Sequence, residues 1–253
     1  MKSVFKALYM AFGMFSVIPA PKSWDESSAK HVMSWLPVVG AVIGAIWWGA
    51  AKLLVLSDMH FALRAAILML IPFVLSGFIH LDGYMDTSDA LLSRRPAGEK
   101  QRILKDPHTG AFAVIMVALL FILKFASAYA LIENGKFFVL LFIIPVLSRC
   151  CSAMTILCVK PMAKEGYAYS FRPVKAAPHR VFTVLTACSV FAMAWLFVGV
   201  PGLIVAGAVI AGYAIAMICA LKGFGFRGLS GDLAGFSLTI SELCGIFACG
   251  ILT

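Results

Sequence analysis

The chain has 253 residues, of which 62% are hydrophobic and only 13% charged. A soluble globular domain carries about a quarter charged residues, so this composition excludes a water-soluble fold, which could not cover so much apolar surface. The net charge of +9 does not indicate nucleic-acid binding. The cations gather in the links between apolar runs, where they report membrane topology or attract an anionic substrate.

A short apolar stretch comes first in the chain. It covers Val4–Ile18 and contains Lys6, so it either lies in the membrane interface or crosses as an eighth span. Seven longer runs follow, each of roughly the 20 residues that a helix needs to cross hydrocarbon. They are about Leu36–Leu56, Phe61–Ile79, Ala111–Ile132, Phe137–Val159, Val181–Val200, Gly202–Leu221 and Leu233–Leu252.

Membrane-spanning strands are excluded, because the runs are too long and open sheet edges cannot face lipid. The sequence therefore predicts an all-α fold, a polytopic integral membrane helical bundle of about seven transmembrane helices plus a short N-terminal apolar helix. We interpret residues 1–253 as a single transmembrane catalytic domain in the lipid bilayer. Gly40 and Gly44 form a Gly-x-x-x-Gly pair, which is typical of close helix packing.

The links between the runs alternate in charge. Links 80–110, 160–180 and 222–232 hold most of the Lys and Arg residues, whereas those near 57–60, 133–136 and 200–202 contribute only Lys136. The positive-inside rule predicts that the basic links are cytoplasmic. We therefore expect a multi-pass protein of the inner (cytoplasmic) membrane, with its active site toward the cytoplasm and its C-terminus on the other side.

Three of the twelve acidic residues are crowded into one segment, as Asp82, Asp86 and Asp89. On a helix they occupy i, i+4 and i+7 and fall within about 60° of one another on one face. Carboxylates so close repel one another unless a cation sits among them, and hard oxygen ligands suit Mg²⁺ or Ca²⁺. The alternative is a solvated helix end. It fits poorly, because the segment continues an apolar run, and ionisable groups at membrane depth are usually functional.

His80 precedes this cluster and would lie about 160° from the carboxylate face. It either acts as a base, supports the carboxylates, or is simply a hydrogen-bonded side chain at the interface. Lys124 and Arg149 stand in the middle of apolar runs. Cations so placed pair with an acid or bind an anion, and Arg suits phosphate particularly well. A structural ion pair with one of the three aspartates or with Glu242 is the alternative.

The last apolar run carries a polar stripe. Asp232, Gly235, Thr239 and Glu242 stand at i, i+3, i+7 and i+10, which is one helical face. Asp232 either caps the helix or contributes to a site. Glu242 lies deep in the apolar run, where a carboxylate needs a partner.

At these residues the chain resembles the cobalamin synthase family, the adenosylcobinamide-GDP ribazoletransferases. The resemblance covers nearly the whole chain, and its most specific part is His-Leu-Asp-Gly-x-x-Asp-x-x-Asp at 80–89. Its other parts are Phe15-Ser-Val-Ile-Pro-Ala-Pro21, Ser93-Arg-Arg95, Lys105-Asp106 ahead of Gly110, Lys124, Ser148-Arg149, Glu165-Gly166, Ser230-Gly-Asp232 and Glu242. The family often has an Arg where Val17 stands, a Gly where Ala113 stands and an acid where Thr239 stands.

The resemblance implies a reaction in which α-ribazole, or its 5′-phosphate, attacks adenosylcobinamide-GDP and GMP leaves. It implies Mg²⁺ as cofactor, held by Asp82, Asp86 and Asp89, with His80 beside them as a catalytic candidate and Asp82 or Asp89 as the base. Substrate-binding roles are expected for Arg95, Lys105, Asp106, Lys124, Arg149, Asp232 and Glu242. Basic groups would clamp the phosphate oxygens.

Two other functions compete with this interpretation. A lipid-type CDP-alcohol phosphotransferase uses similar chemistry, but its signature continues from Asp-Gly into Ala-Arg, whereas Tyr84-Met85-Asp86 follows here. A secondary transporter would use buried charges such as Lys124 and Glu242. The sequence shows no paired interrupted helices in two halves, which are common in transporters, and it places the aspartates at the cytoplasmic end of a span and not at its midplane.

Overall fold

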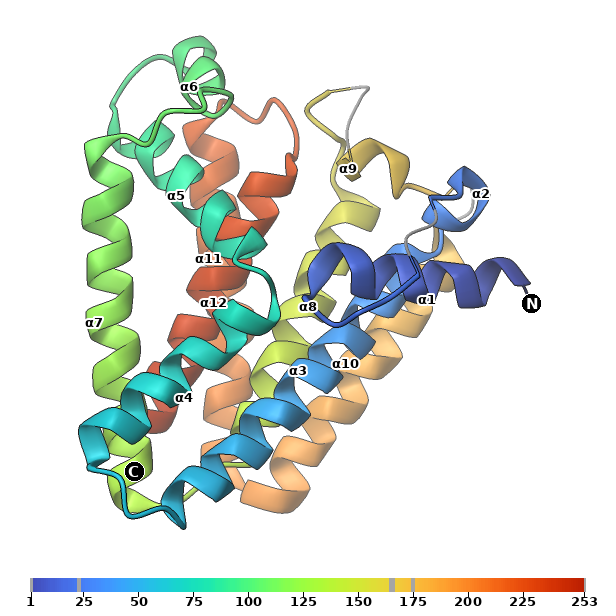
Figure 1. Cartoon of the computed structure of the whole chain (residues 1–253). Coiled ribbons are helices and arrows are strands. Elements are labelled where there is room, and N and C mark those ends of the chain that lie inside the picture. The colour runs from blue at the N-terminus through green and yellow to red at the C-terminus, as the bar shows by residue number, and fades with distance from the viewer. Residues whose placement is uncertain (1, 22–23, 164–166, 174–175, 253) are drawn as a thin grey trace.

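The computed structural model describes residues 2–21, 24–163, 167–173 and 176–252. In these ranges the chain is built from helices, without a named strand. The helices are α1 (Lys2–Phe15), α2 (Glu26–Ala29), α3 (Val32–Val55), α4 (Phe61–Leu75), α5 (Ile79–Leu92), α6 (Ala97–Ile103), α7 (Ala111–Asn134), α8 (Leu140–Cys158), α9 (Tyr167–Ser170), α10 (Ala177–Val198), α11 (Val200–Gly223) and α12 (Gly231–Leu252). Figure 1 shows the long helices side by side as one bundle.

The expected membrane bundle is confirmed. Among the described residues, α3, α7, α8, α10, α11 and α12 are each long and apolar enough to cross a membrane, and α4 with α5 makes a seventh span if the bent pair is counted as one. Helix α1 has 14 residues, so it is roughly 21 Å long at 1.5 Å per residue. It is too short for a hydrocarbon core of about 30 Å. It lies across the long helices (Figure 1), which favours an interfacial position.

The second span, expected at Phe61–Ile79, is sharply bent in the structure. Helix α4 ends at Leu75, α5 begins at Ile79, and the two axes are bent by 91°. Gly77 and Phe78 both adopt left-handed backbone conformations, with φ of 62° and 60°, which no α-helix can continue through. The aspartate segment is helical as predicted, but it forms a separate helix, α5, that turns away from α4 instead of continuing it.

The two ends of the bundle differ as the charge pattern predicts. The segment from α5 to α7 that contains α6, the segment around α9 and the α11–α12 loop all lie at one end, at the top of Figure 1. The C-terminus and the α3–α4 turn lie at the opposite end. The three basic links therefore share one face of the molecule.

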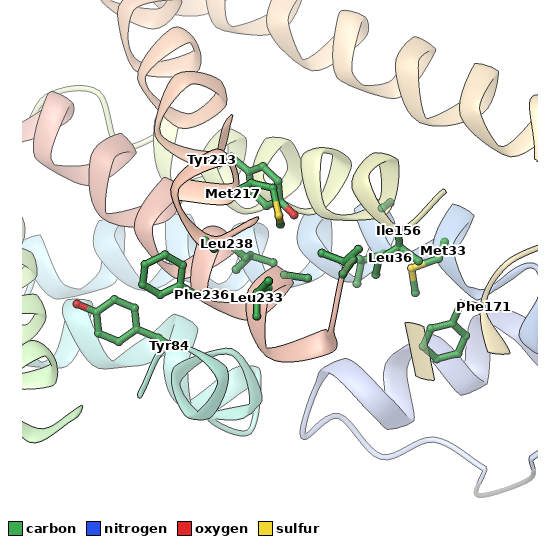
Figure 2. Packing of buried hydrophobic residues seen from close by; sticks show 14 of the residues in the cluster. Met33, Leu36, Tyr84, Ile156, Phe171, Tyr213, Met217, Leu233, Phe236 and Leu238 are labelled. Atoms are coloured by element: carbon green, nitrogen blue, oxygen red, sulfur yellow. The ribbon is translucent and has the colours of Figure 1, made fainter. Parts of the chain in front are cut away.

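Helix α12 is central to the packing of this bundle. Its Leu233, Phe236 and Leu238 belong to a buried cluster that also contains Tyr84 of α5 and Tyr213 of α11 (Figure 2). The rings of Tyr84 and Phe236 stack with centroids 5.6 Å apart and an interplanar angle of 13°. This contact fixes α5 against α12.

Helices α3 and α8 pack closely through the Gly-x-x-x-Gly pair, as predicted. A Cβ placed on Gly44 would lie 2.6 Å from the backbone oxygen of Phe142, and one on Gly40 would lie 2.5 Å from that of Pro145. Both glycines therefore allow a backbone approach that no other residue permits.

We predict that Gly44→Ala lowers the free energy of unfolding by about 1–3 kcal/mol, because its methyl group overpacks the α3–α8 contact. Gly49→Ala on the same helix is the matched control. A Cβ there meets nothing within 4 Å, so the change should be neutral or should stabilise by up to about 1 kcal/mol through helix propensity. Thermal melting of the purified protein in detergent measures both. Equal melting temperatures for the two variants would contradict the close contact.

Candidate functional site

Four carboxylates gather where α5 lies against α12. Asp82, Asp86 and Asp89 share one face of α5, and Asp232 stands in the first turn of α12. The carboxyl group of Asp86 interacts electrostatically with those of the other three. We call these four residues the aspartate cluster. Asp232 thereby stands beside the three aspartates that the sequence proposed as metal ligands, although the sequence suggested only a cap or a substrate contact for it.

Two glycines bring the helices close enough for this grouping. A Cβ on Gly83 would lie 2.9 Å from the Cα and the backbone oxygen of Asp232. One on Gly235 would lie 3.4 Å from the Cα of His80. Because no side chain separates the backbones at these points, Asp232 reaches the aspartate face of α5.

The cluster is rich in hard oxygen donors, which Mg²⁺ prefers. As the side chains stand, no group of three His, Cys, Asp or Glu residues within the described ranges is arranged to hold a metal ion. Asp89 lies directly against Gly110, where a Cβ would overlap its carboxylate. The backbone before α7 therefore closes one side of the cluster.

Two cavities of unequal size border the cluster. The smaller, about 250 Å³, contains Asp232 and Lys105 and lies among α6, the residues after α8, α9 and the α11–α12 loop. The larger, about 550 Å³, contains Asp82 and is lined by the end of α1 and the break between α4 and α5. Each cavity thus reaches one member of the aspartate cluster, Asp232 in the smaller and Asp82 in the larger.

The other residues predicted in the α5–α7 link differ in their surroundings. Arg95 is exposed and forms a 3.8 Å ion pair with Glu99. Asp106 is also exposed; the backbone N–H of His108 donates to its Oδ1 at 3.0 Å and the His108 ring lies 2.7 Å from the same oxygen. These hydrogen bonds hold the pKa of Asp106 below its ordinary value. Of the predicted link residues, Lys105 is the one that lines a cavity with an aspartate.

Lys124, Arg149 and Glu242 form a buried ion network. Arg149 Nη1 lies 2.7 Å from Glu242 Oε1, and Lys124 Nζ lies 3.7 Å from Glu242 Oε2. Ser148 Oγ donates to Glu242 Oε1 at 3.3 Å, and Lys124 Nζ stands 4.1 Å from the centre of the Phe73 ring. Of the two roles left open by the sequence, the structure contains the ion pair with Glu242.

His80 faces this network. Its ring is buried, stacks on Phe15 with centroids 6.2 Å apart, and interacts electrostatically with Arg149 and Glu242. Thr239 Oγ1 donates to the His80 backbone oxygen at 3.1 Å. The polar stripe of α12 therefore runs from the aspartate cluster past His80 to the ion network, and His80 points away from the carboxylate face as its place in the helix predicts.

Sequence reasoning missed two components of the site. Gln101 lines the small cavity with Lys105 and Asp232 and belongs to no recognisable pattern. Ser230 lines it as well, and the sequence offered it only as part of the Ser230-Gly-Asp232 motif, with no role. The approach of α12 to α5 was signalled only by the small residues Gly83 and Gly235, which sequence alone does not pair. Both omissions concern contacts between segments far apart in the chain.

The chain is similar to one family of known proteins over nearly its whole length. A family model described as cobalamin-5-phosphate synthase matches residues 7–250. The chain is 36% identical over 258 residues to an adenosylcobinamide-GDP ribazoletransferase of Clostridium botulinum (strain Alaska E43 / Type E3), and 36% identical over 254 residues to one of Clostridium perfringens (strain 13 / Type A), with all of each chain covered. A protein of the same description from Geobacillus thermodenitrificans is 31% identical, with 93% of this chain and 91% of the relative covered. No solved structure matches.

The buried network predicts an order of stabilities among three variants. Glu242→Gln leaves two buried cations without their carboxylate and should lower the free energy of unfolding by about 3–5 kcal/mol. Arg149→Met and Lys124→Met each leave a one-to-one pair, so both should cost less. The Lys124 change should cost least, because its nitrogen is farther from the carboxylate. Melting temperatures in detergent give the order, and a Glu242→Gln variant as stable as the parent would contradict it.

Proposed function

The chain belongs to the cobalamin-5-phosphate synthase family of transferases in cobalamin synthesis, and we propose that it joins α-ribazole, or α-ribazole 5′-phosphate, to adenosylcobinamide-GDP with release of GMP. The observation that carries the proposal is the aspartate cluster, which two helices build between two cavities. A reaction of two large substrates at one phosphate group needs such an arrangement, with charged groups that both substrates can reach.

The proposed step is a phosphoryl transfer. The 3′-hydroxyl oxygen of the ribazole forms a bond to the phosphorus that carries cobinamide, and the bond from this phosphorus to the bridging oxygen breaks. GMP leaves with the bridging oxygen, and the hydroxyl proton passes to a carboxylate. Asp82 or Asp89 is our candidate for this general base, since a carboxylate within hydrogen-bond reach of the hydroxyl serves that role.

We propose Mg²⁺ as the cofactor, held by Asp82, Asp86 and Asp89. The donor set fits, because carboxylate oxygens are the ligands Mg²⁺ prefers, and the electrostatic interaction of Asp86 with its three neighbours places them close together. All three stand on one helix face, so rotation of their side chains suffices to bring oxygens toward a common ion. When bound, the ion would neutralise charge on the pyrophosphate and steady the leaving group.

The remaining residues position the substrates or support the helices. Lys105 borders the small cavity and is placed to hold a phosphate oxygen. Arg95 and Asp106 are exposed at the same end of the bundle, where Arg95 adds positive charge for a nucleoside diphosphate. Lys124, Arg149 and Glu242 act on the reaction by holding α7, α8 and α12 together. His80 is thereby a positioning residue between this network and Asp82.

We also propose that the protein lies in the inner membrane and that its site opens toward the cytoplasm. The basic links that surround it lie at one end of the bundle (Figure 1), and an excess of Lys and Arg marks the cytoplasmic side.

The direct test of function is incubation of the purified protein with adenosylcobinamide-GDP, α-ribazole and Mg²⁺, followed by mass analysis of the products. The proposal predicts the joined cobamide together with equimolar GMP in detergent, without an ion gradient. Transport of a substrate into vesicles, with no covalent product, would contradict it and favour a transporter.

The aspartate cluster generates a mutational prediction. Asn at position 82, 86 or 89 nearly preserves shape but removes a charged ligand, and each change should lower turnover at least tenfold, which is about 1.4 kcal/mol. Stability in chelator should be equal or higher, because repulsion among the carboxylates is relieved. Asp58→Asn, an exposed aspartate in the α3–α4 turn, is the control and should keep parental turnover. A triple Asn variant that retains the parental rate would exclude the proposed metal site.

Topology gives an independent prediction. In a background without native cysteines, a thiol at position 102 should react with an impermeant reagent from the cytoplasmic side, and one at position 58 from the other side. Both native side chains are exposed, at opposite ends of the bundle. Labelling of both from one side would contradict the arrangement, and reversed labelling would place the site outside the cytoplasm.

A further inference from the structure

The two cavities that border the aspartate cluster differ in size and lining. We infer that the smaller one, which contains Asp232, is the subsite for the nucleoside acceptor, that is, a ribonucleoside with an apolar aromatic base. The inference rests on the proposed function, because it assigns one of its two substrates to a place.

Size is the first argument. The smaller cavity measures about 250 Å³, at the low end of the range of roughly 300–1,000 Å³ for ligand pockets. It has room for one nucleoside but not for a corrin macrocycle with its nucleotide. The larger cavity at Asp82 measures about 550 Å³ and is more open, so the bulkier substrate fits better there, with its pyrophosphate at the shared carboxylates.

The lining supplies the chemistry that a nucleoside with an apolar base requires. Leu104, Met162 and Leu229 form an apolar wall against which an aromatic ring can pack, and Met sulfur favours aromatic contacts. Asp232 and Ser230 lie in the same cavity and can accept hydrogen bonds from ribose hydroxyls. The cavity therefore separates an apolar portion for the base from a polar portion beside the aspartate cluster.

Lys105 gives the cavity a cation suited to a 5′-phosphate. It lines the cavity, its side chain is exposed, and it has no ion-pair partner among the described residues. An ammonium group binds phosphate as a point charge. Lys105 therefore distinguishes the phosphorylated from the unphosphorylated acceptor.

The wall of the cavity is held in place by its own backbone. The N–H of Met162 donates to the Leu229 oxygen at 2.8 Å, and the N–H of Leu229 donates to the Lys160 oxygen at 2.9 Å. Gly228, with φ of 118°, lies so close to Met162 that a Cβ would stand 2.8 Å from its backbone nitrogen. These contacts join the segment after α8 to the α11–α12 loop, so the cavity is formed before the ligand arrives, which limits the entropy cost of binding.

The test places a larger side chain in the cavity by substituting an alanine that lines it. Ala163 is exposed and lines the cavity, and Ala168 on α9 lines it as well. Ala163→Phe should raise KM for α-ribazole about tenfold, because the ring occupies the acceptor's space, and should leave KM for adenosylcobinamide-GDP unchanged. Ala168→Phe serves as a second variant with the same expected split. Ala177→Phe, an exposed alanine at the start of α10 outside this cavity, is the matched control and should change neither KM.

Lys105→Met tests the phosphate contact. It should raise KM for α-ribazole 5′-phosphate about tenfold more than it raises KM for α-ribazole. Melting temperatures of all variants establish that they fold. The inference is overturned if the well-folded Ala163 and Ala168 variants show parental KM for α-ribazole, or if KM for adenosylcobinamide-GDP rises instead.

Calorimetric binding of α-ribazole to the parent and the variants separates this inference from the proposed function. If the parent binds α-ribazole, Ala163→Phe weakens that binding, and the parent shows no transferase activity, the subsite is upheld and the reaction is refuted. If the parent shows transferase activity, but the parent and both cavity variants bind α-ribazole equally well, the reaction is upheld and the subsite is refuted.

Discussion

The close contact of α5 with α12 is the constraint on which the site depends. Gly83 faces the backbone of Asp232 and Gly235 faces that of His80, so the two helices approach with no side chain between them. A side chain at Gly83 would push the helices apart, because close-packed interiors have no free volume to absorb it, whereas a Cβ at Gly235 would already be in van der Waals contact with His80. The stacked rings of Tyr84 and Phe236 hold the same pair of helices. Together these contacts place a carboxylate from α12 beside three carboxylates from α5.

The polar stripe of α12 connects this contact to the centre of the bundle. Beyond the aspartate cluster it passes Thr239, which donates to the His80 backbone oxygen, and ends at Glu242, which is paired with Arg149 and Lys124. A charge in so apolar a place is stable only when it is paired. Since each partner comes from a different helix, the pairing fixes α7, α8 and α12 relative to one another. The helices around the candidate site are thus themselves held by ionic contacts.

Hydropathy and period predicted much of this structure, and tertiary contact accounts for the rest. The apolar runs predicted the long helices, and the positions of Lys and Arg predicted that the basic links share one end of the bundle. Helical spacing predicted the shared face of Asp82, Asp86 and Asp89. Glu242, the partner of Arg149, was one of the four acids that the sequence offered, because few acids lie in apolar runs. The inclusion of Asp232 could not be predicted, since it depends on packing between residues about 150 positions apart. The break in the second span also escaped prediction, because Phe78 adopts a left-handed conformation that is rare outside glycine.

That break has a physical consequence for the N-terminal helix. Irregular backbone at membrane depth is tolerated only where it is buried in protein or lines a wet cavity. Here hydrogen bonds satisfy two carbonyl groups at the end of α4, although Gly77 and Phe78 themselves are exposed: the Val17 N–H donates to the Leu75 oxygen at 2.9 Å, and the Phe78 N–H donates to the Phe73 oxygen at 3.0 Å. The end of α1 and the break together line the larger cavity beside Asp82. The segment that follows this short apolar helix therefore satisfies one carbonyl group at the break, and the end of the helix forms one wall of the cavity beside Asp82.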